Sequence, residues 1–136
     1  MRTRENVEVV LAVFRAIERR DAQRFTSLIH PEFEIRWPPS LPYGQGRRTW
    51  SETWGPLQPT AAERQMDPRV VAANDQEVVV PWRQRGRSPV GGRFDGPVLG
   101  LYRVRHGKLA RAQMFHFDTA AVAGFLADAE RDRASR

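Results

Sequence analysis

The sequence contains no cysteine, which excludes disulfides, thiolate metal sites and a cysteine nucleophile. It also contains no run that approaches the roughly 20 apolar residues of a membrane-spanning helix. Residues 1–11, MRTRENVEVVL, lack the unbroken apolar stretch and the small-residue cleavage site of a signal peptide. We therefore expect a soluble, cytoplasmic protein that has no membrane partner.

Lysine is almost absent, since Lys108 is the only one in the chain, yet the net charge is +6. A basic chain can bind nucleic acid, because arginine and lysine neutralise phosphates. The arginines here are scattered along the chain rather than gathered into one stripe among exposed aromatic residues. We therefore expect no nucleic-acid partner.

Histidine is also scarce, and the three histidines, His30, His106 and His116, lie far apart in the sequence. None of them shows the close helical or strand spacing that pairs of metal ligands use. We therefore expect no metal site.

What is present suffices for one domain over residues 1–136, because 40% of the residues are apolar and can fill one core.

The second of the predicted helices has clear signals at both ends: Asp21 is placed to cap its start, and the step from His30 to Pro31 should end it. Hydrophobic spacing and turn signals predict helices over 3–20, 22–29, around Trp50 and Trp54, and over 119–130, and strands over 32–37, 69–73, 77–85, 93–104 and 109–117.

Helices grouped before an antiparallel meander indicate an α+β fold in which the helices cover one face of the sheet. Strict alternation points Trp82, Gln84 and Tyr102 toward these helices. The outer face keeps Leu99 and Leu101, which is more apolar surface than a solvated sheet needs. We therefore expect a homodimer that covers this outer face.

The stretch QMFHFD over 113–118 ends the last predicted strand. Alternation puts His116 and Asp118 on one side of the strand and Gln113, Phe115 and Phe117 on the other. An imidazole beside a carboxylate can do acid-base chemistry. A packed histidine followed by an aspartate that caps the next helix fits the same residues, and we favour the cap for Asp118.

The aromatic residues with polar tips suit a mostly apolar pocket that has a few orienting hydrogen bonds. Ordinary core packing is the other interpretation of the same residues. We expect Gln84 and Gln113 to point inward beside these rings. The candidate ligand-binding residues are Trp37, Tyr43, Trp54, Trp82, Gln84, Tyr102, Gln113 and Phe115.

The segments PEFEIRWP, PYGQGR, VVVPWRQRGR, GPVLGLYRVRHGKLAR and FHFD, in this order, resemble the SnoaL-like group of the nuclear transport factor 2-like superfamily. The resemblance implies a cone-shaped barrel, in which a curved and mostly antiparallel sheet packs on N-terminal helices around an apolar cavity. It also implies a homodimer and chemistry without a cofactor. The superfamily includes polyketide cyclases, epoxide hydrolases, ketosteroid isomerases and binding proteins without activity.

The chain departs from the catalytic members of that group. Where those members have a catalytic aspartate on the last strand, this chain has Phe115. Where they often have a polar residue on the third meander strand, it has Gly100. Where the epoxide hydrolases have an arginine and an aspartate two positions apart, it has Trp82 and Gln84. Two functions stay open. The first is a cofactor-independent cyclase or isomerase that acts on a polyketide-like or steroid-like carbonyl compound, with His116 and Asp118 as catalytic residues. The second is a binding module for an apolar small ligand.

Overall fold

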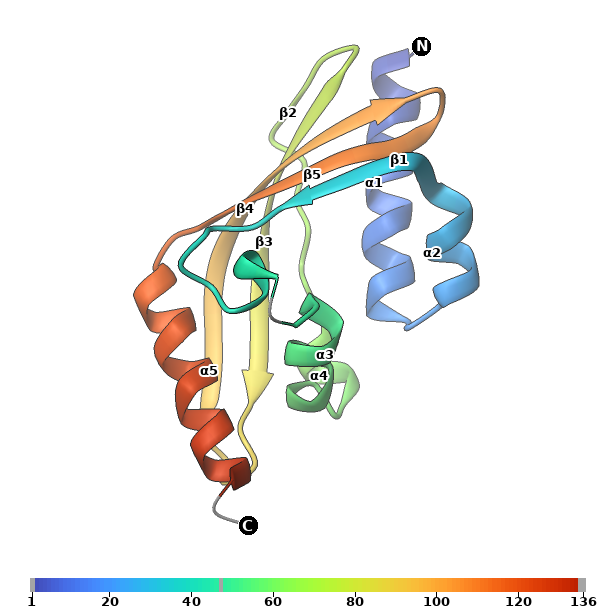
Figure 1. Cartoon of the computed structure of the whole chain (residues 1–136). Coiled ribbons are helices and arrows are strands. Elements are labelled where there is room, and N and C mark those ends of the chain that lie inside the picture. Colours follow the sequence, from blue (N-terminus) through green and yellow to red (C-terminus); the bar gives the residue numbers. More distant parts are fainter. Residues whose placement is uncertain (1, 47, 135–136) are drawn as a thin grey trace.

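The computed structural model describes residues 2–46 and 48–134 (Figure 1). Its helices and strands follow the order expected from the sequence, with α4 and two short 3-10 helices in addition. The elements are α1 (Arg2–Glu18), α2 (Ala22–Leu28), β1 (Ile29–Arg36), η1 (Tyr43–Gln45), α3 (Trp50–Trp54), η2 (Gly55–Leu57), α4 (Ala61–Arg64), β2 (Ala72–Ala73), β3 (Glu77–Arg87), β4 (Arg93–Arg105), β5 (Lys108–His116) and α5 (Thr119–Ala134).

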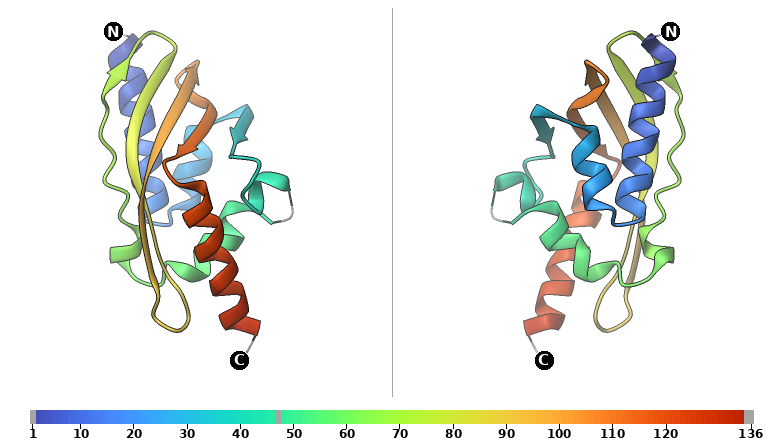
Figure 2. Two further views of the ribbon diagram at one scale, coloured as in Figure 1. Left: turned by 90° about the vertical axis from the view of Figure 1, so that its left-hand side faces the viewer. Right: turned by 90° about the vertical axis from the view of Figure 1, so that its right-hand side faces the viewer.

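One five-stranded sheet, in the order β1-β5-β4-β3-β2, organises the chain. Strands β2 to β5 form an antiparallel meander, and β1 joins β5 in parallel. The sheet is curled, with the helices gathered around its concave side, and it does not close into a complete barrel (Figures 1 and 2). The α+β architecture expected from the sequence is confirmed.

The helix boundaries follow from local capping. The Asp21 carboxylate accepts a hydrogen bond from the Arg24 backbone N–H at 3.0 Å, as the sequence predicted. Helix α2 ends at Leu28, and β1 begins directly at Ile29, so the chain leaves helical geometry just before His30. Helix α3 begins with a capping box, in which Thr49 and Glu52 satisfy each other's backbone N–H groups.

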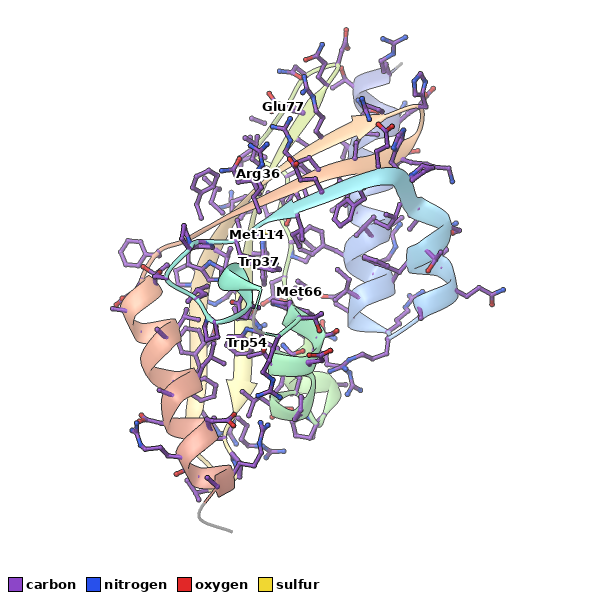
Figure 3. The ribbon with its side chains drawn as sticks, in the orientation of Figure 1. Arg36, Trp37, Trp54, Met66, Glu77 and Met114 are labelled. Carbon is purple, nitrogen blue, oxygen red and sulfur yellow. The ribbon has the colours of Figure 1, made fainter. Side chains whose placement is uncertain are left out.

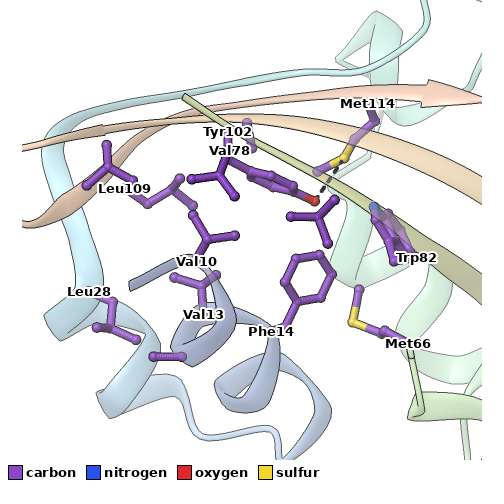
Figure 4. Close-up of a cluster of buried hydrophobic side chains, with 14 of the residues drawn as sticks. Val10, Val13, Phe14, Leu28, Met66, Val78, Trp82, Tyr102, Leu109 and Met114 are labelled. Atoms are coloured by element: carbon purple, nitrogen blue, oxygen red, sulfur yellow. Dashed lines mark hydrogen bonds between the residues drawn. The ribbon is translucent and has the colours of Figure 1, made fainter. Parts of the chain in front are cut away.

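Two apolar clusters fill the concave side of the sheet. The first packs α1 and α2 against the sheet, with Phe14 edge-on to both Trp82 and Tyr102 (Figure 4). The second packs α5 and α3 together at Phe94 of β4 and includes Trp54. Trp37, which follows β1, contacts both clusters (Figure 3).

The face assignment for the last strand is wrong for Gln113 and Phe115. The register shifts between Arg103 and Val104, so that Val104 pairs with Leu109 while Arg103 pairs with Arg111. One extra residue on β5 therefore lies opposite the shift, and the alternation changes phase after it. The residues of β5 that point inward past this bulge are Ala112, Met114 and His116. Gln113 and Phe115 lie on the outer face, where Phe115 is 48% exposed.

Within residues 2–46 and 48–134, no helix is both long enough and apolar enough to cross a bilayer.

Candidate functional site

Rows of paired residues run across the concave, inner face of the sheet. Trp82 on β3 pairs with Val98 on β4, and Val98 pairs with His116 on β5. The next row toward the β3–β4 hairpin pairs Gln84 with Gly96. Side chains of residues paired directly across strands point to the same face. Trp82, Gln84 and His116 therefore project toward the same concave space, as the sequence predicted for Trp82 and Gln84.

His116 is the one histidine on the inner face. Its ring centroid lies 6.1 Å from that of Trp37. Both ring nitrogens are buried, and neither has a hydrogen-bond partner among the described residues. Burial lowers the pKa of His116 to about 4. The imidazole is therefore neutral at pH 7, with one nitrogen free to donate and the other free to accept.

A pocket of about 220 Å³ reaches His116 where β5 ends and α5 begins. It brings His116 and Asp118 together, but the two side chains form no hydrogen bond with each other in the part of the chain that the structure describes. The Asp118 carboxylate instead accepts a hydrogen bond from the Ala121 backbone N–H at 3.0 Å. The predicted helix cap is confirmed, whereas a catalytic role for the pair stays a prediction. The pocket is lined by Phe94, Asp95, Gly96, Pro97, His116, Phe117, Asp118, Ala121 and Val122.

A second carboxylate at this pocket, Asp95, is held by arginines of the outer face. Arg83 lies 2.7 Å and Arg85 3.4 Å from its oxygens. Partial burial alone would raise the pKa of Asp95, but the hydrogen bonds and charges of Arg83 and Arg85 outweigh it and hold the pKa below the usual range. Asp95 is therefore an ionised, paired carboxylate.

Four of the rings expected to line a ligand site lie inside the packed clusters. Trp54, Trp82, Tyr43 and Tyr102 are each less than a tenth exposed. The Trp54 indole donates to the Tyr43 hydroxyl at 3.3 Å, and burial raises the pKa of Tyr43 to about 12. None of these four rings is among the residues that line the pocket at His116.

The Tyr102 hydroxyl has a weak partner, since it donates to the Met114 sulfur at 3.6 Å (Figure 4). Burial raises the pKa of Tyr102 well above its usual range, and the nearby Trp82 indole acts in the opposite direction. Tyr102 and His116 are therefore both uncharged at neutral pH, and no residue that points inward from β3, β4 or β5 carries a charge.

A larger and more open hollow of about 600 Å³ lies between the β3–β4 hairpin and helix α5. Its rim includes Arg93, Asp128, Arg131 and Asp132. It does not reach the inner face beyond Phe94, and the Arg131 and Asp128 side chains on its rim pair with each other. We place the candidate site at the smaller pocket, because that pocket reaches His116.

A SnoaL-like domain is matched over residues 10–112. The chain belongs to the SnoaL-like domain family. No protein of curated function has a sequence that matches it significantly.

Solved structures share the fold of this SnoaL-like protein at low sequence identity. TerC, co-crystallised with polyporic acid, is 20% identical with a TM-score of 0.70, over 90% of this chain and 98% of TerC. A chain from Jannaschia sp. CCS1, assigned as a SnoaL-like polyketide cyclase, is 20% identical with a TM-score of 0.66, over 88% and 90% of the two chains. A nuclear transport factor 2-like protein from Burkholderia pseudomallei is 17% identical with a TM-score of 0.67, over 87% and 94%.

The sequence did not single out several pocket residues of this SnoaL-like protein. Phe94 and Val122 line the pocket, but neither was among the candidate residues, because an apolar side chain at a regular core position carries no signal of a site. Gly96 carries no side chain, so no pattern of chemistry pointed to it. Among the described residues, no group of three histidine, aspartate or glutamate side chains is placed to hold a metal ion.

Proposed function

We propose that this SnoaL-like chain, acting as a single domain without a cofactor, binds an apolar ring compound that bears a carbonyl group. The ligand enters by the pocket at His116 and lies against the inner face of the sheet. Its chemical class is polyketide-like or steroid-like. A cytoplasmic location stays a prediction.

His116 is the observation that carries the proposal. Burying a polar group that has no partner costs free energy, so a packed core rarely keeps both nitrogens of an imidazole unpaired. His116 keeps both, at the end of a pocket whose other walls are largely apolar. A ligand oxygen or hydroxyl would satisfy them, and the rings of Phe94 and Trp37 would contact its apolar body.

If the protein is an enzyme, His116 would act as its general base and general acid. Its free nitrogen would take a proton from the carbon beside the ligand carbonyl, and the imidazolium would return that proton to an oxygen or to another carbon of the same molecule. No electron is gained or lost, so no cofactor is needed. Asp118, at the same pocket, would stabilise the imidazolium.

A binding role without chemistry is favoured by a different observation. Asp118 is already engaged as the cap of α5, and the pKa of His116 near 4 makes its imidazole a weak base at neutral pH. In this case His116 only orients the ligand through a hydrogen bond.

The decisive experiment is recovery of the bound molecule. We expect mass spectrometry of the protein purified from its own cells to show a co-purifying aromatic or polycyclic carbonyl compound. Binding should change tryptophan emission, because Trp37 lies next to His116. Conversion of the recovered compound by the wild type, but not by a His116→Gln variant that still binds it, supports the enzyme. Saturating binding by calorimetry without conversion supports the binding module.

We further propose that the chain forms a homodimer through the outer face of β3, β4 and β5. Leu99 and Phe115 pair across β4 and β5 on this face and are 43% and 48% exposed. Pro81, which pairs with Leu99 from β3, extends the same apolar row. Monomers do not usually leave such a row of large apolar side chains in water. Sedimentation velocity at micromolar concentration tests this proposal.

A further inference from the structure

We infer that Gln84 forms a subsite for an uncharged polar group of the ligand, so that the site selects neutral compounds over anions. The inference rests on the proposed ligand-binding function and adds the ligand's charge and a residue that recognises it.

Gln84 is 1% exposed, and its amide has almost no hydrogen bonds. The Oε1 atom has no partner among the described residues, and Nε2 only approaches the carbonyl oxygen of Arg85 at 3.5 Å. A primary amide can donate two hydrogen bonds and accept two. A glutamine buried in this state costs free energy unless a ligand pairs with it.

A second buried glutamine provides the comparison within the same chain. Gln58 on the segment after η2 is 5% exposed, and its Nε2 donates to the same Arg85 carbonyl oxygen at 2.9 Å. Its Oε1 accepts from Arg20 at 3.5 Å. Both polar atoms of the Gln58 amide therefore have a partner in the protein, whereas Gln84 Oε1 has none among the described residues.

The pocket at His116 leads toward Gln84 through one aromatic ring. Gln84 pairs with Gly96, and Gly96 lines that pocket. Gly96 has no side chain, and the ring of Phe94 covers its inner side, since a Cβ added at Gly96 would lie 2.7 Å from Phe94 Cζ. Phe94 is only half-buried and itself lines the pocket. In the proposed complex this ring, which also packs against Trp54 and Phe125, turns aside so that a ligand extends from His116 to the amide of Gln84.

The charges around this path exclude anions. No residue that points inward from β3, β4 or β5 is charged, so a buried anion would meet no cation. Asp118 lines the pocket through which the ligand enters, whereas the carboxylate of Asp95 is neutralised by Arg83 and Arg85. An anion would lose its hydration and approach the Asp118 carboxylate, both of which oppose binding. A neutral amide, hydroxyl or ketone meets neither cost.

The first experiment needs no ligand. It compares Gln84→Met with Gln58→Met, because methionine has a similar length and lacks the amide. Relief of an unpaired buried amide should raise the melting temperature of Gln84→Met by about 2–5 °C, whereas loss of paired hydrogen bonds should lower that of Gln58→Met by a similar amount. A loss of stability in Gln84→Met that matches Gln58→Met would show that Gln84 is a structural residue and would overturn the inference.

The second experiment uses a matched pair of probes, 2-naphthamide and 2-naphthoate, which share one ring system and differ in charge. We expect the wild type to bind the amide at least about 10-fold more tightly by calorimetry, and Gln84→Met to lose most of this preference. Equal or tighter binding of the naphthoate would overturn the inference while leaving ligand binding itself established. If neither probe binds the wild type, the proposed binding function loses support, and the melting temperatures alone decide the state of Gln84.

Discussion

On the inner face of the sheet the side chains of β3 to β5 are uncharged, and Gln84 and His116 keep polar atoms that have no partner among the described residues. On the outer face the charges have partners, for example Arg83 with Asp95 at 2.7 Å, while Leu99 and Phe115 leave apolar surface exposed. The inner face thus lacks hydrogen-bond partners, and the outer face lacks apolar cover. The carbonyl group of the proposed ligand would supply the first, and the second copy of the chain in the proposed homodimer would supply the second.

The largest effect should come from the outer face. Phe115→Asp puts a carboxylate at the centre of the proposed contact, where symmetry places it opposite its own copy. We expect the dimer dissociation constant to rise at least about 100-fold, which is about 2.7 kcal/mol, in sedimentation experiments. Val90→Asp is the control, because Val90 is 65% exposed in the β3–β4 hairpin, away from this row. A wild type that sediments as a monomer would contradict the proposed homodimer.

On the inner face, the most costly change should be Gly100→Ala. The ring of Tyr102 lies directly over Gly100, and an added Cβ would overlap it. We expect a loss of about 2 kcal/mol in the free energy of unfolding, measured from urea denaturation. Gly124→Ala is the control, since nothing lies near that position on α5, and alanine there should stabilise the helix slightly. Equal effects of the two substitutions would contradict the tight packing of Tyr102.

A smaller effect should appear as pH dependence. The pKa of His116 is about 4 in the folded chain, compared with 6.5 for an unperturbed histidine. The unfolded chain therefore binds the proton first, so the contribution of His116 to stability is constant above pH 6.5 and declines as the pH falls toward 4. After allowance for partial exposure of the ring, we expect a loss of about 1–2 kcal/mol over this range.

The measurement is the difference between the wild type and His116→Gln in urea midpoints across the same pH range. The difference isolates His116 from the carboxylates that also titrate at the acid end. Parallel curves for the two proteins would show that His116 is not held in a neutral state.

The smallest effect concerns Asp118, which lies past the end of β5 and belongs to neither face. Its carboxylate caps α5, so Asp118→Ala should cost about 1 kcal/mol and Asp118→Asn much less, because asparagine caps nearly as well. Denaturant midpoints at unchanged slope measure both. Thr119→Ala is the control for an alternative cap. If alanine and asparagine at 118 prove equally neutral while Thr119→Ala is costly, the cap belongs to Thr119.

Local signals predicted all three central strands, and they predicted which side chains point inward on two of them, β3 and β4. Asp21 caps α2 as expected, because capping depends on a few neighbouring residues. Trp82, Gln84 and Tyr102 point inward as expected, because the alternation along β3 and β4 is uninterrupted. The parallel pairing of β1 with β5 was not predicted, since it joins segments that are far apart in the sequence.

The candidate site was predicted only in part. His116 was identified, but the inward placement of Gln113 and Phe115 failed at the bulge, which no local pattern revealed. The missing partners of Gln84 could not be read from the sequence either. They depend on which donors of other elements come within reach of Gln84 Oε1 in the folded chain, and none of the described residues supplies one.

The bulge beside Arg103 has a consequence for how such chains diverge. Because the bulge sets the phase of the residues after it on β5, a change that straightened the bulge without removing a residue would turn His116 outward and bring Gln113 and Phe115 inward. The pocket would then exchange an imidazole for a phenyl ring without any amino-acid replacement in its wall. Two relatives with nearly identical residues on this strand can therefore present different chemistry to their ligands, and aligning them by residue identity alone would conceal it.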